Sequence, residues 1–565
     1  MGSELGVSAD SKAEAVYSPV AIWWACWAGI WTVAVASGIT YLVLNRNSPT
    51  LRIRGIGLSL SAVVFIHLYF MSVQFGIMAG PLLPGDAEFW LMGTYLPCGI
   101  VLFQASNTRF LHVAKLQKKY AHRDSRIDLT PDLTPKPGLK NRFNSLSFNM
   151  KTFICVGIAW AVQLFLTVLM WLISRKWHSS WGIPGTEVHG TEMEQKYEMG
   201  RGWEWWPTIV CQFVWSWIVA PIVLWKARHI HDTQGWRTQT IGCVVSSLHA
   251  TPMWLIGVYV PGMAPVNAVW LPPQWICLSI IFIEIFAVFL PCWEVMRSQT
   301  LRKETLDSIA QWELKTKGIG SDRKSLASAS TVVESFMSGF KSANGSVESD
   351  ASREGLMSMS ALEYVLERNP APLQQFSALH DFSGENIAFL TSLADWKTSL
   401  PKDIQDGTAL ADENSRELIR ERFNRALYIY AEFISVRHAE FPVNISSQDL
   451  RRLETIFEGP ARIMYGDERE VDSVTPFDTP GYNMQPLQPT ESEGSTKAFR
   501  STVAALRDRV QYWGDVPDEF DLTVFDAAEE SIKYLVLTNT WPRFIKSRRV
   551  SSDSTVTLRS GMTAV

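Results

Sequence analysis

Seven apolar segments before residue 296 constrain the fold more than any other feature of this sequence. Each is roughly long enough to cross a bilayer as a helix of about 20 residues. In lipid a backbone must satisfy its own hydrogen bonds, and a helix does so within one segment. The predicted spans are residues 20–44, 55–79, 87–105, 152–173, 207–225, 238–259 and 272–295. The sequence therefore predicts an all-α fold that begins with a polytopic seven-helix transmembrane domain.

Charged residues between the spans predict the orientation, because cytoplasmic loops carry an excess of Lys and Arg. The first, third and fifth loops are basic and contain Arg46, Arg52, Arg54, Arg109, Lys115, Lys118, Lys119, Arg123, Arg126, Lys136, Lys140, Arg142, Lys151, Lys226, Arg228 and Arg237. The second loop holds only acids, the fourth more acids than bases, and the sixth no charge. This alternation places the N-terminus outside and everything after residue 295 in the cytoplasm.

Composition supports a membrane protein and excludes several other classes. Nearly all of the 24 Trp residues lie before Trp312, and Trp is enriched at the two faces of a bilayer. The seven cysteines all lie in apolar segments, where they pack as small buried residues and form neither a disulfide framework nor a metal site. These are Cys26, Cys98, Cys155, Cys211, Cys243, Cys277 and Cys292. The net charge of −4 comes with no basic face suited to nucleic acid.

Three ionisable residues inside the predicted spans are candidates for an intramembrane polar site. His67, His249 and Glu284 are costly to place in lipid, and such groups often serve a ligand or a proton. An interhelical hydrogen bond, or a position near the membrane surface, is the alternative for each. Three prolines, Pro221, Pro252 and Pro291, predict kinks in their spans.

After the last span the sequence becomes polar. Residues 296–317 are charged and helix-prone, and Arg297, Arg302 and Lys303 are placed to meet anionic lipid headgroups. Residues 321–360 are rich in Ser, Ala and Gly and predict a flexible tether, either plainly solvated or phosphorylated on its serines. The sequons that begin at Asn344 and Asn444 should stay unglycosylated on the cytoplasmic side.

The rest of the chain has helical spacing and predicts an antiparallel bundle. Its long helix is predicted at 413–438, with a buried face of Ile419, Phe423, Ala426, Leu427, Tyr430, Phe433 and Ile434. A Pro-, Asp- and Ser-rich stretch at about 466–496 interrupts the pattern and predicts a disordered insertion.

One short segment of this bundle, DFSGENIAFL at 381–390, places polar groups where one helix ends and the next begins. Ser383 suits an N-cap, Glu385 lies in the first turn where the helix dipole favours a carboxylate, and both Glu385 and Asn386 should lie at an exposed helix end. Two further segments, PVNISS at 442–447 and LVLTNTWPRFIKS at 535–547, follow downstream. Together these three segments resemble the regulator of G-protein signalling (RGS) domain, over residues 359–549.

The resemblance implies a domain that grips a Gα subunit and stimulates its GTP hydrolysis. Gα supplies its own catalytic arginine, so the RGS partner adds no catalytic residue, cofactor or metal and is itself no enzyme. Its Gα-facing residues here would be Phe382, Ser383, Glu385, Asn386, Asn444, Leu535, Asn539, Thr540 and Arg543. Asn444 would stand near the Gα glutamine, where an amide both donates and accepts. Arg543 would either brace the surface from within or contact the partner.

The seven spans followed by this domain resemble the receptor-RGS hybrid proteins of fungi and plants. The predicted organisation is an extracellular N-terminus (1–19), a seven-span domain (20–295), a juxtamembrane helix and linker (296–358), the RGS domain (359–549) and a C-terminal tail (550–565). The expected partners are a GTP-bound Gα subunit and membrane lipid, and the expected location is the plasma membrane. Whether an extracellular ligand binds is left open.

Two residues depart from the RGS pattern. Asn539 stands where the family usually has Asp, so an acceptor is kept and a charge is lost. Leu390 replaces a customary Trp, which we expect to be a change of core packing. Two alternatives also remain at this stage: a receptor whose spans sense a ligand, and a scaffold that binds a G protein without stimulating hydrolysis.

Overall fold

The computed structural model describes residues 12–121, 143, 146, 148–178, 180–318, 356–398, 413–465 and 512–548. These described residues form helices and no strand; a single isolated bridge pairs Ser174 with Ile183. The all-α prediction is therefore confirmed for this part of the chain. Two compact units divide it: the first takes the residues up to Val113 and those from Arg142 to Met296, and the second takes residues from Ala114 and the described residues from Arg297 onward.

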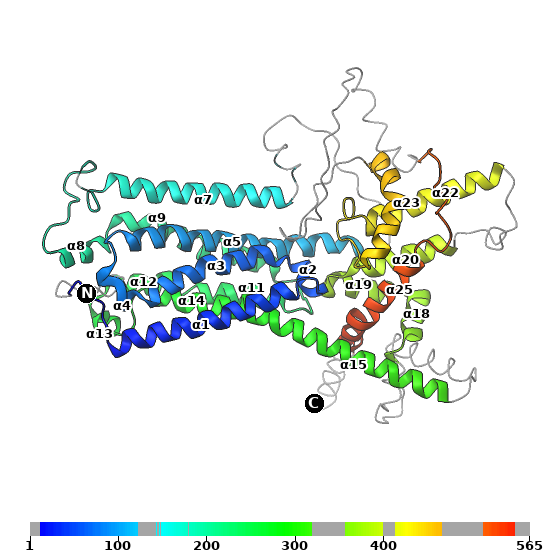
Figure 1. Ribbon diagram of the computed structural model, residues 1–565, viewed down its shortest axis with the longest axis horizontal. Helices are drawn as coiled ribbons and strands as arrows, with labels where there is room; N and C mark the ends of the chain where they lie inside the picture. Colours follow the sequence, from blue (N-terminus) through cyan, green and yellow to red (C-terminus); the bar gives the residue numbers. More distant parts are fainter. Residues whose placement is uncertain are drawn as a thin grey trace, which may run out of the picture. The chain divides into compact units, whose positions relative to one another are not determined.

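The prediction of seven spans is confirmed as far as length and composition decide it. Seven helices among the described residues are long and apolar enough to cross a membrane, which indicates a membrane protein. They are Pro19–Leu44, Ile56–Gln74, Ala87–Tyr120, Phe148–Ile173, Trp203–Ala227, Trp236–Tyr259 and Gln274–Asp307. In the first unit the long helices run side by side (Figure 1).

Several of these spans are built from more than one helical segment. The main elements are α1 (Pro19–Leu44), α2 (Pro49–Arg54), α3 (Ile56–Gln74), α4 (Gly76–Ala79), α5 (Ala87–Gln117), α7 (Phe148–Ile173), α8 (Glu192–Met199), α9 (Trp206–Phe213), η5 (Val214–Val219), α10 (Ala220–Ala227), α11 (Trp236–Ser247), α12 (Ala250–Tyr259), α13 (Ala264–Asn267), α14 (Gln274–Glu284), η7 (Ile285–Phe289) and α15 (Leu290–Gly318). Short 3₁₀ turns complete them as η1 (Gly80–Leu82), η2 (Lys118–Tyr120), η4 (Trp203–Trp205) and η6 (Pro261–Met263).

Prolines shape two of the spans in the first unit. The π-helical segments η5 and η7 each end just before a proline, Pro221 and Pro291, which is the second residue of the helix that follows. A proline has no N–H to donate, so the helix upstream of it changes its hydrogen-bond register.

A glycine allows close packing of α3 and α5. A Cβ atom added at Gly99 of α5 would lie 3.1 Å from the backbone nitrogen of Ile66 in α3. Small residues of this kind let two membrane helices approach closely.

The helix of the third predicted span continues beyond residue 105. Helix α5 continues to Gln117, and η2 carries the turn on to Tyr120. Beyond Ala105 the helix is amphipathic: Phe110, Val113 and Gln117 are buried, while Lys115 is exposed. A span predicted from hydropathy ends at the first polar residues. The buried residues of α5 keep their helical spacing beyond that point, so the helix continues.

The second unit is a bundle of helices that includes the end of α5. Its other elements, which appear in Figure 1 from green to red, are α18 (Met359–Arg368), α19 (Ala371–Phe376), η8 (Ser377–Asp381), α20 (Gly384–Thr398), α22 (Glu413–Ile429), η9 (Tyr430–Ile434), α23 (Ser447–Tyr465), α25 (Asp526–Leu535) and η10 (Val536–Thr540). One hydrophobic core joins all of these helices, and Leu390 is buried within it, as a change of core packing requires. The predicted long helix ends at Ile434 and not at residue 438, and Ile419 is 38% exposed.

Aromatic rings form the centre of this core. Phe457 of α23 stacks on Phe423 of α22 and on Phe525, with ring centroids 5.5 Å apart in both pairs. Phe520 meets Phe423 edge-on at 5.0 Å. Offset and edge-to-face rings of this kind stabilise a fold beyond the area they bury.

Some predictions lie outside the described residues. They are the first residues of the N-terminus, most of the Ser-rich tether, the insertion at 466–496 and the C-terminal tail.

Candidate functional site

A buried carboxylate joins two of the three motif segments in the second unit. Asp381 ends η8 and is 1% exposed. Its Oδ2 accepts hydrogen bonds from the hydroxyls of Ser383 and Thr540, both at 2.9 Å, and its Oδ1 lies 2.7 Å from Nη1 of Arg543. A buried carboxylate is tolerable only with such partners. The sequence placed Ser383, Thr540 and Arg543 on one surface; Asp381, which links them, was missed although it is the first residue of the motif.

The backbone at Phe382 is unusual. Its φ of 51° is left-handed, and among the described residues no other residue except glycine has a positive φ. This conformation turns the chain sharply between η8 and α20, while the Phe382 ring is 1% exposed and packs inside. Ser383 directly precedes α20, as expected of an N-cap, but its hydroxyl donates to Asp381. The strained turn is held by the buried ring and by the Asp381 network.

Glu385 and Asn386 are not at an exposed helix end, so that expectation is corrected. Their exposed fractions are 7% and 6%. The reason is Gln117, at the end of α5, whose Nε2 donates to Glu385 Oε2 at 2.9 Å and whose Oε1 accepts from the Gly384 N–H at 3.1 Å. Nothing in the sequence indicated this contact, because Gln117 and Glu385 are 268 residues apart.

The remaining residues of the predicted surface differ in exposure. Asn444 is exposed, and the neighbouring Val443 anchors its turn by donating its backbone N–H to the Phe433 carbonyl at 2.8 Å. Leu535 and Asn539 are half-buried. The Asn539 amide nitrogen donates to the Leu535 carbonyl at 3.2 Å, a contact that an aspartate could not make. In the second unit, therefore, Asn444 is exposed to solvent, and Asn539 is partly engaged within its own helix.

In the first unit, two of the three intramembrane candidates meet. His67 Nδ1 lies 2.8 Å from Glu284 Oε1, Trp31 Nε1 donates to Glu284 Oε2 at 2.5 Å, and Thr32 Oγ1 lies 3.0 Å from His67 Nε2. The cluster connects α1, α3 and α14, and Glu284 is fully buried. This is the interhelical hydrogen bond that the sequence left open. Among the described contacts none joins His249 to either residue, and Trp31 and Thr32 were missed because neither is ionisable.

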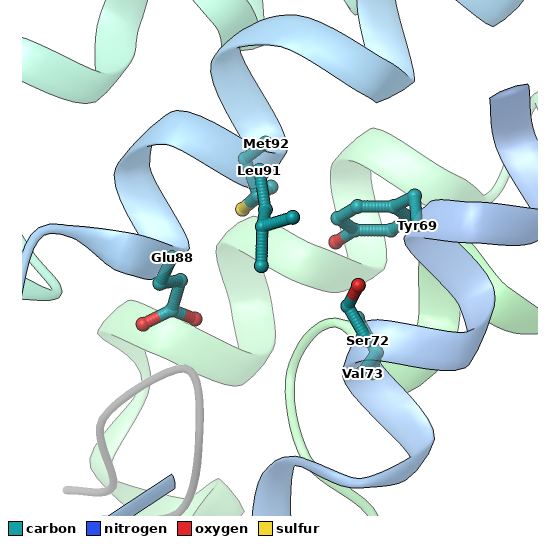
Figure 2. A pocket seen from close by; sticks show the side chains of 6 residues that line it. All are labelled: Tyr69, Ser72, Val73, Glu88, Leu91 and Met92. Carbon is teal, nitrogen blue, oxygen red and sulfur yellow. The ribbon is translucent and has the colours of Figure 1, made fainter. Parts of the chain in front are cut away.

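A small pocket lies between α3 and α5 in the same unit. Tyr69, Ser72 and Val73 face Glu88, Leu91 and Met92 across it (Figure 2). Its cavity volume is about 10 Å³, room for about one water molecule, whereas most small-molecule sites hold roughly 300–1,000 Å³. The pocket therefore gives no basis for assigning a ligand to the spans.

Within the part of the chain that the structure describes, no group of three or more His, Cys, Asp or Glu side chains is arranged to hold a metal ion. Comparison of the chain with models of protein families, with curated proteins and with solved structures gave no match. Any function therefore has to be argued from the motif segments and their contacts.

Proposed function

We propose that the second unit binds a GTP-bound Gα subunit and accelerates its GTP hydrolysis, as the RGS domains that it resembles do. The observation that carries the proposal is the hydrogen-bonded set of Asp381, Ser383, Thr540 and Arg543. It joins two of the motif segments across 157 residues of chain. Asp381, Ser383 and Thr540 are buried, so this set braces the motif segments from within. Segments that are fixed in this way can hold a partner's loops in one conformation without reorganising themselves.

A domain of this kind accelerates GTP hydrolysis through binding alone. Hydrolysis by Gα depends on how well its switch loops, its glutamine and the attacking water are held at the transition state. A partner that binds this arrangement more tightly than the ground state accelerates the reaction and needs no catalytic group. Asn444 suits this role, because an exposed amide can donate to one group and accept from another.

The membrane unit supports the same proposal. We place the second unit on the cytoplasmic side of the plasma membrane, which follows from the basic loops and from the location of Gα. Confinement to the plane of the membrane raises the effective concentration of the two partners, so a modest affinity is sufficient.

Single-turnover GTP hydrolysis by a panel of Gα subunits, with the full-length protein in lipid nanodiscs, tests the proposal. We expect acceleration of at least one Gα, and a loss of about tenfold in Asn444→Ala, since one hydrogen bond at the transition state is worth about 1.4 kcal/mol. Gln448→Ala removes another exposed amide nearby and should behave as wild type.

Two results would contradict the proposal. If Asn444→Ala accelerates hydrolysis as well as wild type does, the Asn444 side-chain amide has no part in the acceleration. No acceleration of any Gα, by wild type or by the uncovered variant described below, would leave a scaffold that binds without stimulating hydrolysis.

A further inference from the structure

Residues 117–120, which we call the cover segment, occupy the start of α20. Gln117 is fully buried, and its side-chain amide uses both of its ends on this surface, one on Glu385 and one on the Gly384 N–H. The bond to Glu385 is charge-assisted, which makes it stronger than a bond between two neutral groups. The cover segment thus engages Glu385, one of the residues that the resemblance assigns to the Gα-facing surface.

The rest of the cover segment is seated in the same bundle. The Tyr120 carbonyl accepts from Gln374 Nε2 at 2.9 Å, and the Tyr120 ring packs against Phe433 and Phe441 with centroids 6.3 and 6.4 Å away. Lys119 Nζ lies 3.5 Å from Glu432 Oε1. Tyr120 is 3% exposed, so this is a packed contact rather than a chance approach of a loop.

Gly384 permits the close approach. A Cβ atom at this position would lie 2.8 Å from the Cβ of Tyr120 and equally close to the Cβ of Ala378, closer than real Cβ contacts come. The absence of a side chain at Gly384 therefore lets η2 reach the first turn of α20.

We propose that the cover segment is a built-in inhibitor that blocks Gα from part of its binding surface. This inference rests on the proposed function. Gα and the cover segment compete for Glu385, and the cover segment also occupies the neighbouring Gly384 N–H, whereas Asn444 stays exposed in the covered state. Only the fraction of molecules in which the segment has left can bind fully, so the apparent affinity for Gα falls by that fraction.

An unsatisfied polar group lies next to the covered site. The side-chain oxygen of Asn386, the residue after Glu385, is buried without a hydrogen-bond partner among the described residues. When the segment leaves, water or Gα can satisfy this oxygen, which offsets part of the cost of opening.

The test uses the full-length protein in nanodiscs and a variant that repels the cover. Gln117→Glu replaces the donor to Glu385 with a second carboxylate. Lys118→Gln is the matched control, because it makes the same change in net charge at the next, exposed position. Gln117→Ala is a second variant that removes both hydrogen bonds without adding charge, and circular dichroism checks that each variant keeps its helices.

Two readouts separate this inference from the proposed function. Hydrogen–deuterium exchange of peptides spanning 382–390 reports the cover without any Gα, and single-turnover hydrolysis reports the activity. We expect about tenfold faster exchange at Gly384 and about tenfold greater acceleration of Gα in Gln117→Glu, a smaller gain of both in Gln117→Ala, and wild-type values in Lys118→Gln.

If hydrogen–deuterium exchange of the peptides spanning 382–390 is unchanged in both Gln117→Glu and Gln117→Ala, the cover segment does not protect the start of α20. Faster exchange with acceleration equal to wild type would overturn the inhibition while the GTPase-activating function stands. Faster exchange with no acceleration of any Gα would overturn the proposed function, and the inhibition with it.

Discussion

A single carboxylate in the second unit links two helices and gives the fold a pH dependence. Glu529 of α25 pairs with Lys397 of α20 at 2.5 Å and with Lys533 at 2.9 Å. Burial acts to raise the pKa of Glu529, but hydrogen bonds from Lys397 and Lys533 outweigh it and hold that pKa below its ordinary value. A lowered pKa in the folded state contributes stability above the unfolded pKa, and this stability is lost as the pH falls through the folded value.

We expect Glu529→Gln to lower the unfolding temperature of the second unit at pH 7 and to flatten its loss of stability as the pH falls below the ordinary glutamate pKa of about 4.5. The group is partly exposed, so solvent screening limits the effect to about 1 kcal/mol. Differential scanning calorimetry of the full-length protein across this range measures both. Glu530→Gln removes an exposed charge from the next position and serves as the control. If Glu529→Gln keeps the wild-type pH profile, the assignment is wrong.

For single residues, the sequence predicted which polar side chains belong to the candidate site better than it predicted the residues that they contact. Ser383, Thr540 and Arg543 were expected on one surface, and Asp381 connects them. Gln117 was not expected at the site, because a buried glutamine in a basic loop has no local pattern that marks it. A contact between residues 268 positions apart is decided by packing, which a single sequence does not contain.

Among the elements, α23 shows how one helix holds the bundle together. Phe457 packs between Phe423, Tyr430 and Phe525, with centroids 5.3 to 5.5 Å away. Ile463 of the same helix is 74% exposed. The two positions therefore give a matched pair of a core residue and a surface residue.

We expect Phe457→Ala to destabilise the second unit by about 3–5 kcal/mol, because it removes a large buried ring and leaves a cavity. Ile463→Ala should change stability by less than about 0.5 kcal/mol. Chemical denaturation followed by hydrogen exchange of peptides from α20 and α25 measures the effect in the full-length protein. Equal stability of the two variants would mean that the aromatic stack is not the centre of the core.

The sequence located the elements well but misplaced some of their ends. Apolar length alone marks a span, and all seven predicted segments overlap a candidate span in the structure. Ends are set by weaker forces: α5 continues past Ala105 on an amphipathic face, and the helix of α22 and η9 stops at Ile434 where Ser435 leaves helical geometry. Both errors arise where tertiary packing, rather than composition, decides the boundary.

For the whole molecule, the proposed orientation makes the fourth loop extracellular. His189 is exposed in this loop, and Gly190 and Thr191 follow it. We expect His189→Asn, which completes a sequon, to acquire an N-linked glycan during translation with microsomes. A mobility shift that an endoglycosidase reverses measures it.

The native sequon at Asn444 is the internal control and should stay unmodified. Modification at Asn444, with none after His189→Asn, would reverse the proposed topology and place the second unit on the wrong side of the membrane for Gα.

The cover segment and the surface that it occupies belong to one polypeptide. Each molecule therefore carries its inhibitor in fixed one-to-one stoichiometry, so neither dilution nor overproduction of the protein changes the covered fraction. In a cell that makes ten times more of the protein, the GTPase-activating activity with the cover segment in place and the activity after its release would rise by the same factor, so their ratio would not change. The strength of the response would then depend on what opens the segment, and variation in expression between cells would leave its fold-change intact.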